Sequence, residues 1–149
     1  MRKGALVACG IVGVITVVTL FASRPGPDLR RLRDDRLANY LPQGATETYR
    51  HEVGKARLPI LGATPRAKIS RRIGSFRKHC FESLINEAVR SGWKFPDGVN
   101  QRADTKTLYR RLQDRYLLLI VSEHDVADPH EVGILLLDER LPLPQGWST

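Results

Sequence analysis

The residues best suited to metal binding gather in one short stretch near the C-terminus. The stretch EHDVADPHE contains imidazole and carboxylate groups, which suit zinc and related ions, at His124, Asp125, Asp128, His130 and Glu131. Their spacing matches no familiar metal site, and no helix places two of them on one face. We therefore interpret the stretch as a solvated connection and expect no metal and no cofactor. A small metal-dependent enzyme that uses residues 124–131 is the alternative.

No other group of residues predicts catalysis. The stretch VGK, residues 53–55, does not form a phosphate-binding loop, because Tyr49 stands where the first glycine is required and Ala56 stands where a hydroxyl residue is required. Glu82 and Glu87 are five positions apart on a predicted helix and do not share a face well, so they do not form a carboxylate pair. Cys80 falls among apolar positions and is interpreted as an inert core thiol. We expect no catalytic residue and a protein that is not an enzyme.

The stretch RRIGSFRK contains the strongest candidate for a binding site. Ser75 is predicted to cap a helix, and a helix N-terminus exposes unpaired N–H groups with a partial positive charge. Arg71, Arg72, Arg77 and Lys78 surround this point, so the stretch predicts an anion-binding corner. Near a membrane the anion could be a lipid headgroup, whereas the alternative is a set of solvated charges. Nucleic acid is not expected, because no aromatic residue is interleaved with the basic ones.

The first uncharged stretch, residues 4–23, is long enough to cross a bilayer. It reads GALVACGIVGVITVVTLFAS, and twenty helical residues span about 30 Å. A membrane anchor is therefore predicted to begin at Gly4 and Ala5 and to end at Ala22 and Ser23. Cleavage after either of the last two residues would leave a large residue at position −3, which is unfavourable for a signal peptidase. We expect an uncleaved, single-pass helix in the cell membrane, in contact with membrane lipid.

Two signals disagree about the orientation of this anchor. The short start MRK is typical of exported proteins and favours an extracytoplasmic C-terminal domain, which is our expectation. Five arginines in the next thirteen residues favour the cytoplasm by the positive-inside rule. They are Arg24, Arg30, Arg31, Arg33 and Arg36.

Composition limits the chain to one domain and an appendage. It has 149 residues, two cysteines and a net charge of +8, so a disulfide framework is not expected. The charge is unevenly distributed. Residues 50–78 contain nine Lys or Arg against one acid, whereas residues 123–139 contain six acids and no Lys or Arg.

Periodicity predicts an α+β fold for residues 45–141. Alternation or short apolar runs predict five strands, ATETYRHEV, RAKISRRI, KTLYRRL, RYLLLIVSE and VGILLLDE, with Gln113 and Asp114 in a tight hairpin. The stretch SFRKHCFESLINEAVRSG has a helical apolar stripe that ends at Gly92. We expect a two-layer domain in which a mainly antiparallel sheet carries one helix on one face. Residues 24–44 are assigned to a juxtamembrane linker or short helix, and residues 142–149 to an extended tail.

The last two predicted strands are apolar on both faces, whereas one helix covers only one face. A large exposed apolar surface usually marks an interaction. Residues 29–41 could fold back over the second face, or a second copy of the domain or another protein could cover it. The sequence thus favours an anchored, non-catalytic interaction domain that binds a protein partner or forms a homodimer. An electrostatic module for anionic lipid headgroups or a cell-envelope polymer is the alternative.

The stretch LRDDRLANYLPQGATE, residues 32–47, resembles a segment of uncharacterised actinomycete proteins. These are small single-pass membrane proteins in which a segment of the type LRDDP-A-Y-PPG precedes a compact α+β domain whose helix ends in Gly-Trp, as Gly92 and Trp93 do here. Arg36 stands where that pattern has proline. The resemblance implies an anchor and an α+β fold, and it implies no catalytic residue.

Overall fold

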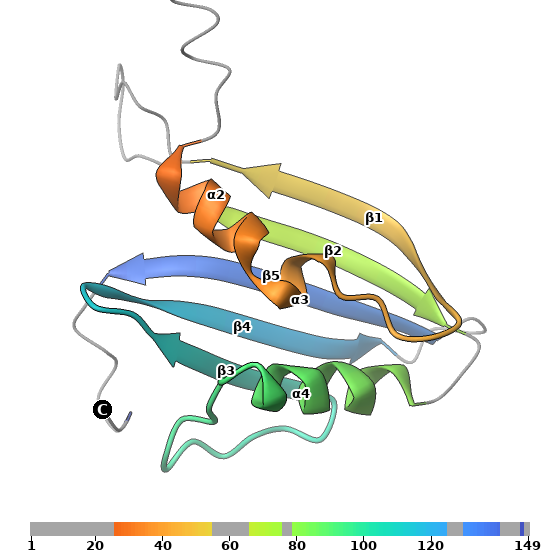
Figure 1. The fold of residues 1–149 in the computed structure, drawn as a ribbon. Coiled ribbons are helices and arrows are strands. Elements are labelled where there is room, and N and C mark those ends of the chain that lie inside the picture. The colour runs from red at the N-terminus through yellow and green to blue at the C-terminus, as the bar shows by residue number, and fades with distance from the viewer. Residues whose placement is uncertain (1–25, 55–65, 76–78, 125–129, 141–146, 148–149) are drawn as a thin grey trace, which may run out of the picture.

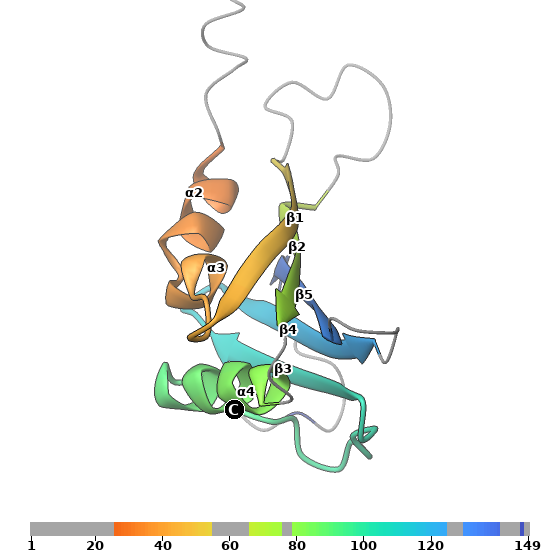
Figure 2. The ribbon, with the colours of Figure 1, turned by 90° about the vertical axis from the view of Figure 1, so that its right-hand side faces the viewer.

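The chain forms one five-stranded antiparallel sheet with helices on one of its faces (Figures 1 and 2). The computed structural model describes residues 26–54, 66–75, 79–124, 130–140 and 147. The strands are β1 (Ala45–Val53), β2 (Lys68–Ser75), β3 (Thr105–Arg111), β4 (Arg115–His124) and β5 (His130–Arg140), in the spatial order β1-β2-β5-β4-β3. The helices are α2 (Pro27–Asp34), α3 (Arg36–Asn39) and α4 (Cys80–Arg90). The predicted α+β class and antiparallel sheet are confirmed.

The strand order follows from one local hairpin and one long-range pairing. In the β3–β4 hairpin, the N–H of Leu112 donates to the carbonyl of Arg115 at 2.8 Å, so Gln113 and Asp114 form the turn as predicted. Strand β5 then inserts between β4 and β2, antiparallel to both. β4 and β5 therefore have strand neighbours on both sides. Both have buried residues at alternate positions with half-buried side chains between them, which explains their nearly continuous apolar sequence.

Helix α4 begins later than predicted and ends where predicted. Ser75 does not cap it: Ser75 is the last residue of β2 and pairs with both Ala45 and His130, and the residue that precedes the helix is His79. These pairings extend β2 as far as Ser75, so the residue predicted to cap the helix belongs to the strand instead. At the other end, Gly92 has φ = 86°, and its N–H bonds to Val89 while that of Trp93 bonds to Ala88. These two bonds are those of a Schellman motif.

The segment assigned to a linker belongs to the folded domain. Asp35 separates α2 from α3, and its carboxylate accepts a hydrogen bond from the N–H of Leu37 at 2.9 Å, which caps α3. Leu29 and Leu32 of α2 and Leu37 of α3 are buried in the core. Asp35 has an extended backbone, so the buried residues of this segment belong to two short helices and do not follow one continuous helical stripe.

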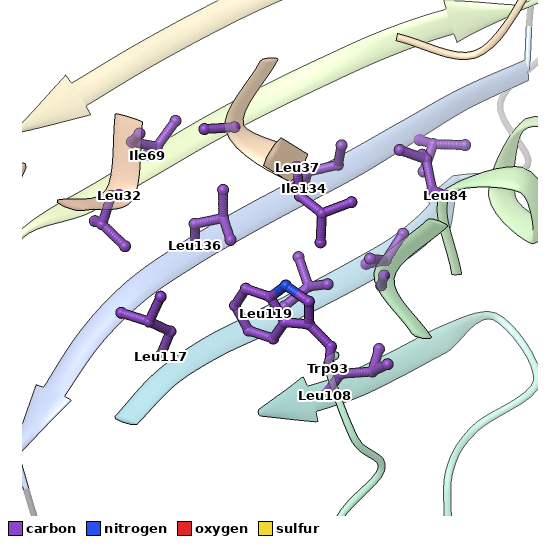
Figure 3. Packing of buried hydrophobic residues seen from close by; sticks show 14 of the residues in the cluster. Leu32, Leu37, Ile69, Leu84, Trp93, Leu108, Leu117, Leu119, Ile134 and Leu136 are labelled. Carbon is purple, nitrogen blue, oxygen red and sulfur yellow. The ribbon is translucent and has the colours of Figure 1, made fainter. Parts of the chain in front are cut away.

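Both helical segments lie on the same face of the sheet, which corrects two expectations. Figure 2 shows α2, α3 and α4 on one side of the strands. The expected layer of one helix is thus a layer of three, and residues 29–41 do not fold over the second face. The core lies between this layer and the sheet, where Trp93 is packed with Leu108, Leu117 and Leu119 (Figure 3).

Candidate functional site: the open face of the sheet

Strand register divides the sheet into a covered face and an open face. In β4, Leu117, Leu119 and Val121 are buried under the helices, and the intervening side chains project from the other side. No helix of the described residues covers that other side (Figure 2). We call it the open face.

The centre of the open face is apolar. Leu118 pairs with Leu137, and Ile120 pairs with Leu135, across the junction of β4 and β5. All four side chains are half-buried. These four residues, called the aliphatic patch, come from β4 and β5, which both have sheet neighbours on both sides, so the patch lies in the interior of the sheet.

An aromatic cluster borders the patch at one end. The ring centroid of Trp147 lies 4.9 Å from that of Tyr109 and 5.9 Å from that of Tyr116. Burial, with a smaller contribution from Glu139, raises the pKa of Tyr116 above its usual value. Trp147 belongs to the tail that the sequence predicts to be extended, so this tail residue contacts the open face.

Two of the arginines that border the patch pair within the chain. Arg72 lies 4.0 Å from the carboxylate of Glu131, and its guanidinium lies 5.6 Å from the ring centroid of Tyr49. Arg66 pairs with Glu139 at 2.8 Å. Both ion pairs join the basic stretch around β2 to the acidic stretch around β5, because these two strands are neighbours. The open face therefore has less uncompensated charge than the sequence suggested.

The residues of the predicted anion-binding corner do not share one surface. Arg71 points to the covered face and is 2% exposed. It pairs with Glu47 and donates to the carbonyls of Leu37 and Tyr40 at 2.9 and 3.1 Å. Arg72 points to the open face, because successive residues of a strand alternate in direction. Ser75 is buried at the end of β2, and Arg77 and Lys78 lie outside the described residues.

The metal-ligand candidates fall largely into strands. His124 ends β4, and His130 and Glu131 begin β5, with His124 opposite Glu131. Asp125 and Asp128 lie outside the described residues. Within the described residues, no three His, Cys, Asp or Glu side chains are close enough to hold one ion. Cys80 is 3% exposed, and burial, together with the nearby Glu123, raises the pKa of its thiol.

A pocket of about 430 Å³ opens between α4 and the edge of the sheet. Phe81 and Ile85 supply apolar walls, and Glu82, Glu123 and Lys106 supply charges. Its lining contains no Ser, Thr, Cys or His side chain. The ammonium of Lys106 donates to the carbonyl of Arg102 at 2.7 Å.

The ion pairs of α2 and α3 were not predicted from the sequence. Arg31 pairs with Asp138 at 2.9 Å, Arg33 with Glu52 at 2.6 Å, and Arg36 with Glu87 at 2.7 Å. Asp28 pairs with Arg115 at 2.9 Å, and Asp35 with Arg110 at 2.5 Å. Each partner lies at least nineteen positions away in the chain, so no local pattern could have revealed these pairs. Three of the arginines that looked like a positive membrane flank, Arg31, Arg33 and Arg36, thus form ion pairs within the domain.

The predicted anchor residues Gly4, Ala5, Ala22 and Ser23 lie outside the described residues. Among the helices that the structure describes, none is long and apolar enough to cross a bilayer. Scans against protein-family models, curated proteins and solved structures returned no match. The actinomycete resemblance of residues 32–47 therefore stays an expectation.

Proposed function

We propose that this protein is a membrane-tethered, non-catalytic binding module that self-associates through the open face of its sheet. The aliphatic patch carries the proposal, because four aliphatic side chains occupy the centre of a face that no described helix covers. The tether is the uncharged stretch of residues 4–23.

A flat apolar sheet face suits packing against a second sheet. Two sheets stack face to face about 10 Å apart with their side chains interdigitated. Fully burying an exposed Leu or Ile contributes about 1.5–3 kcal/mol. The patch residues are half-buried already and would gain only part of that, so the whole face must take part in the contact.

A second copy of the chain fits this face better than a charged ligand. Arg72 and Arg66 already pair with Glu131 and Glu139, so the open face offers few unpaired charges to a polymer or headgroup. A two-fold contact places the same patch on both sides and needs no further partner chemistry. Tethering both copies to one bilayer also raises their effective concentration.

The module needs no catalytic group for this role. The thiol of Cys80 is buried and its pKa is raised, which makes it a poor nucleophile. The described residues of the 124–131 stretch mainly extend β4 and β5. No specific observation favours the metal-dependent alternative.

The test is the oligomeric state of the full chain in detergent, measured by sedimentation. We expect a dimer for the native chain and a monomer for Ile120→Glu, because the variant would bury an unpaired carboxylate between two apolar faces. Association should weaken by roughly a hundredfold. Leu135→Thr, which places a smaller, uncharged β-branched side chain on the strand, should weaken it less.

Val89→Glu is the matched control. Val89 lies on the outer side of α4 and is 49% exposed, so the same charge there should leave the dimer intact. Circular dichroism would confirm that all variants stay folded. A native chain that remains monomeric at every concentration, or a folded Ile120→Glu variant that dimerises as well as Val89→Glu, would refute the proposal.

A further inference from the structure

We infer that the end of the sheet next to α2 is a docking surface for the anionic headgroups of the membrane that carries the tether. The inference rests on the proposed tether, and it concerns one end of the sheet rather than the aliphatic patch at the centre of the open face. Three observations support it: the place at which the chain enters the domain, the charges at the end of the sheet next to α2, and the charges at the opposite end of the sheet.

The chain enters the domain close to its predicted membrane segment. Only residues 24–26 separate Ser23 from Pro27, the first residue of α2. Four peptide steps reach at most about 14 Å. The first turn of α2 must therefore stay within that distance of the end of an embedded segment.

The first turn of α2 lies at one particular end of the sheet. Asp28 pairs with Arg115 at the start of β4, and Arg31 pairs with Asp138 near the end of β5. In Figure 1, the arrowheads of β1, β3 and β5 point toward the side on which α2 begins. We call this the tether end; it consists of the ends of β1, β3 and β5, the starts of β2 and β4, and the β3–β4 turn.

The acids of the tether end are already neutralised. Asp28, Asp114 and Asp138 each pair with Arg115. Glu139 pairs with Arg66. Glu52 pairs with Arg33 and Arg50. An anionic surface that approaches this end therefore meets carboxylates whose charge is compensated.

Four basic residues at or beside the tether end have no ion-pair partner among the described residues. They are Arg30, Lys68, Arg111 and Arg140. Arg30 is on the exposed side of α2, and Arg111 and Arg140 are the exposed last residues of β3 and β5. Because they come from different elements around one end, they form a ring of positive charge rather than a pocket for a single anion.

The opposite end of the sheet has the opposite character. Asp104 precedes β3, Glu123 lies near the end of β4, and Glu82 lies in the first turn of α4. Within the described residues, none of the three carboxylates pairs with Lys or Arg, and the imidazole of His79 lies 3.5 Å from Glu82. The tether end thus has an excess of unpaired positive charge, whereas at the opposite end these three acids outnumber Arg102 and Lys106, which also form no ion pair within the described residues.

A lipid surface fits this arrangement better than a soluble anion. The charges lie at the rim of a sheet, with the tether at the same place, so a planar anionic surface can contact them together. Each basic residue near an anionic membrane contributes about fivefold to the docking equilibrium. Removing two of them should therefore reduce docking by about thirtyfold.

The test uses the full chain reconstituted in vesicles of phosphatidylcholine, with and without phosphatidylglycerol and with a trace of dansyl-labelled lipid. Energy transfer from Trp93 and Trp147 to the dansyl group reports how close the domain lies to the headgroups. We expect more transfer in the anionic vesicles, and we expect added salt to abolish the difference because it screens exposed charges.

The decisive comparison is between two charge-matched double variants. Arg111→Gln with Arg140→Gln should lose the anionic-lipid effect, whereas Arg102→Gln with Lys106→Gln, which removes two charges near the start of β3, should keep it. Equal transfer in both kinds of vesicle, or equal loss in both double variants, would overturn the inference.

Alkaline carbonate extraction separates this inference from the proposed tether. A chain retained in both kinds of vesicle has the tether, and the transfer measurement then judges the tether end alone. A chain that carbonate releases has no tether, and the proposed tether is then refuted. Headgroup docking is refuted with it if the released chain does not cosediment with anionic vesicles, and it is supported if cosedimentation occurs and is abolished by salt.

Discussion

The guanidinium of Arg71 connects three segments that are distant in the sequence. It pairs with Glu47 of β1 and donates to the carbonyls of Leu37 in α3 and Tyr40 beyond it, at 2.9 and 3.1 Å. With 2% of its surface exposed, Arg71 is the polar centre of the contact between α3 and the sheet. It holds the end of the helical segment against β1 and β2.

Arg71→Met should therefore destabilise the domain. Removing one partner of a buried ion pair leaves the other groups desolvated and unpaired, at a cost of about 3–5 kcal/mol. Glu47 keeps some exposure, so the lower end of that range is expected. Urea unfolding followed by tryptophan fluorescence would measure the change. Arg72→Met is the adjacent control, with a side chain that is 61% exposed, and it should cost less than about 1 kcal/mol. Equal losses in the two variants would contradict the structural role of Arg71.

Glu52 makes part of the stability depend on pH. Burial opposes its ionisation, but hydrogen bonds from Arg50 and Arg33 outweigh burial and lower the pKa of Glu52 below its usual value of 4.5. The folded state thus binds this proton more weakly than the unfolded state. The stabilisation is present above pH 4.5 and is lost as the pH falls through the lowered pKa.

Glu52→Gln should remove this contribution. We expect the native chain to be more stable than the variant at pH 7, and the difference to shrink as the pH falls below 4.5. Urea unfolding of both proteins at several pH values would measure it. A difference that does not change between pH 7 and pH 3 would show that the ionised carboxylate is not responsible.

At the scale of elements, the segment formed by α2 and α3 behaves as part of the core. Leu32 is completely buried and Leu37 is 1% exposed. Ion pairs to β1, β4, β5 and α4 fix the segment from several sides. The domain therefore begins at α2, and only three residues remain as a connection to the predicted anchor.

Leu32→Ala tests this boundary. Deleting a buried leucine side chain costs about 2–5 kcal/mol through lost burial and the cavity that remains. Leu41→Ala is the control in the same stretch, because Leu41 is 42% exposed, and it should cost less than about 1 kcal/mol. Denaturant midpoints of the two variants would decide the question. A Leu32→Ala variant as stable as the native chain would return residues 27–34 to the linker.

At the scale of the whole molecule, the structure separates two surfaces with different chemistry. The open face is apolar at its centre, and the bordering Arg66 and Arg72 are paired with acids, whereas the tether end carries unpaired basic residues. Self-association should therefore respond to Ile120→Glu and be nearly independent of salt. Headgroup docking should respond to Arg111→Gln with Arg140→Gln and depend strongly on salt. Each set of variants thus serves as a control for the other surface.

The sequence by itself determined features that depend on neighbouring residues. The predicted bounds of β1 are those of the structure. The turn between β3 and β4 and the end of helix α4 before Gly92 also lie where the sequence predicts them. Alternation, turn residues and positive-φ glycines act over a few positions, so their physical cause is present in the local sequence.

Only the tertiary structure decided which surfaces meet. Periodicity shows that a side chain is buried but not what covers it. Residues 29–41 were therefore only one candidate cover for the second face, and they are found on the same face as α4. The uneven charge of residues 50–78 and 123–139 predicted a basic surface. The pairing of β2 with β5 brings Arg66 to Glu139 and Arg72 to Glu131 instead. Ser75 was predicted to cap a helix, but it is the last residue of β2 and pairs with residues of β1 and β5. These outcomes depend on contacts between distant segments, whose energies no short stretch of sequence contains.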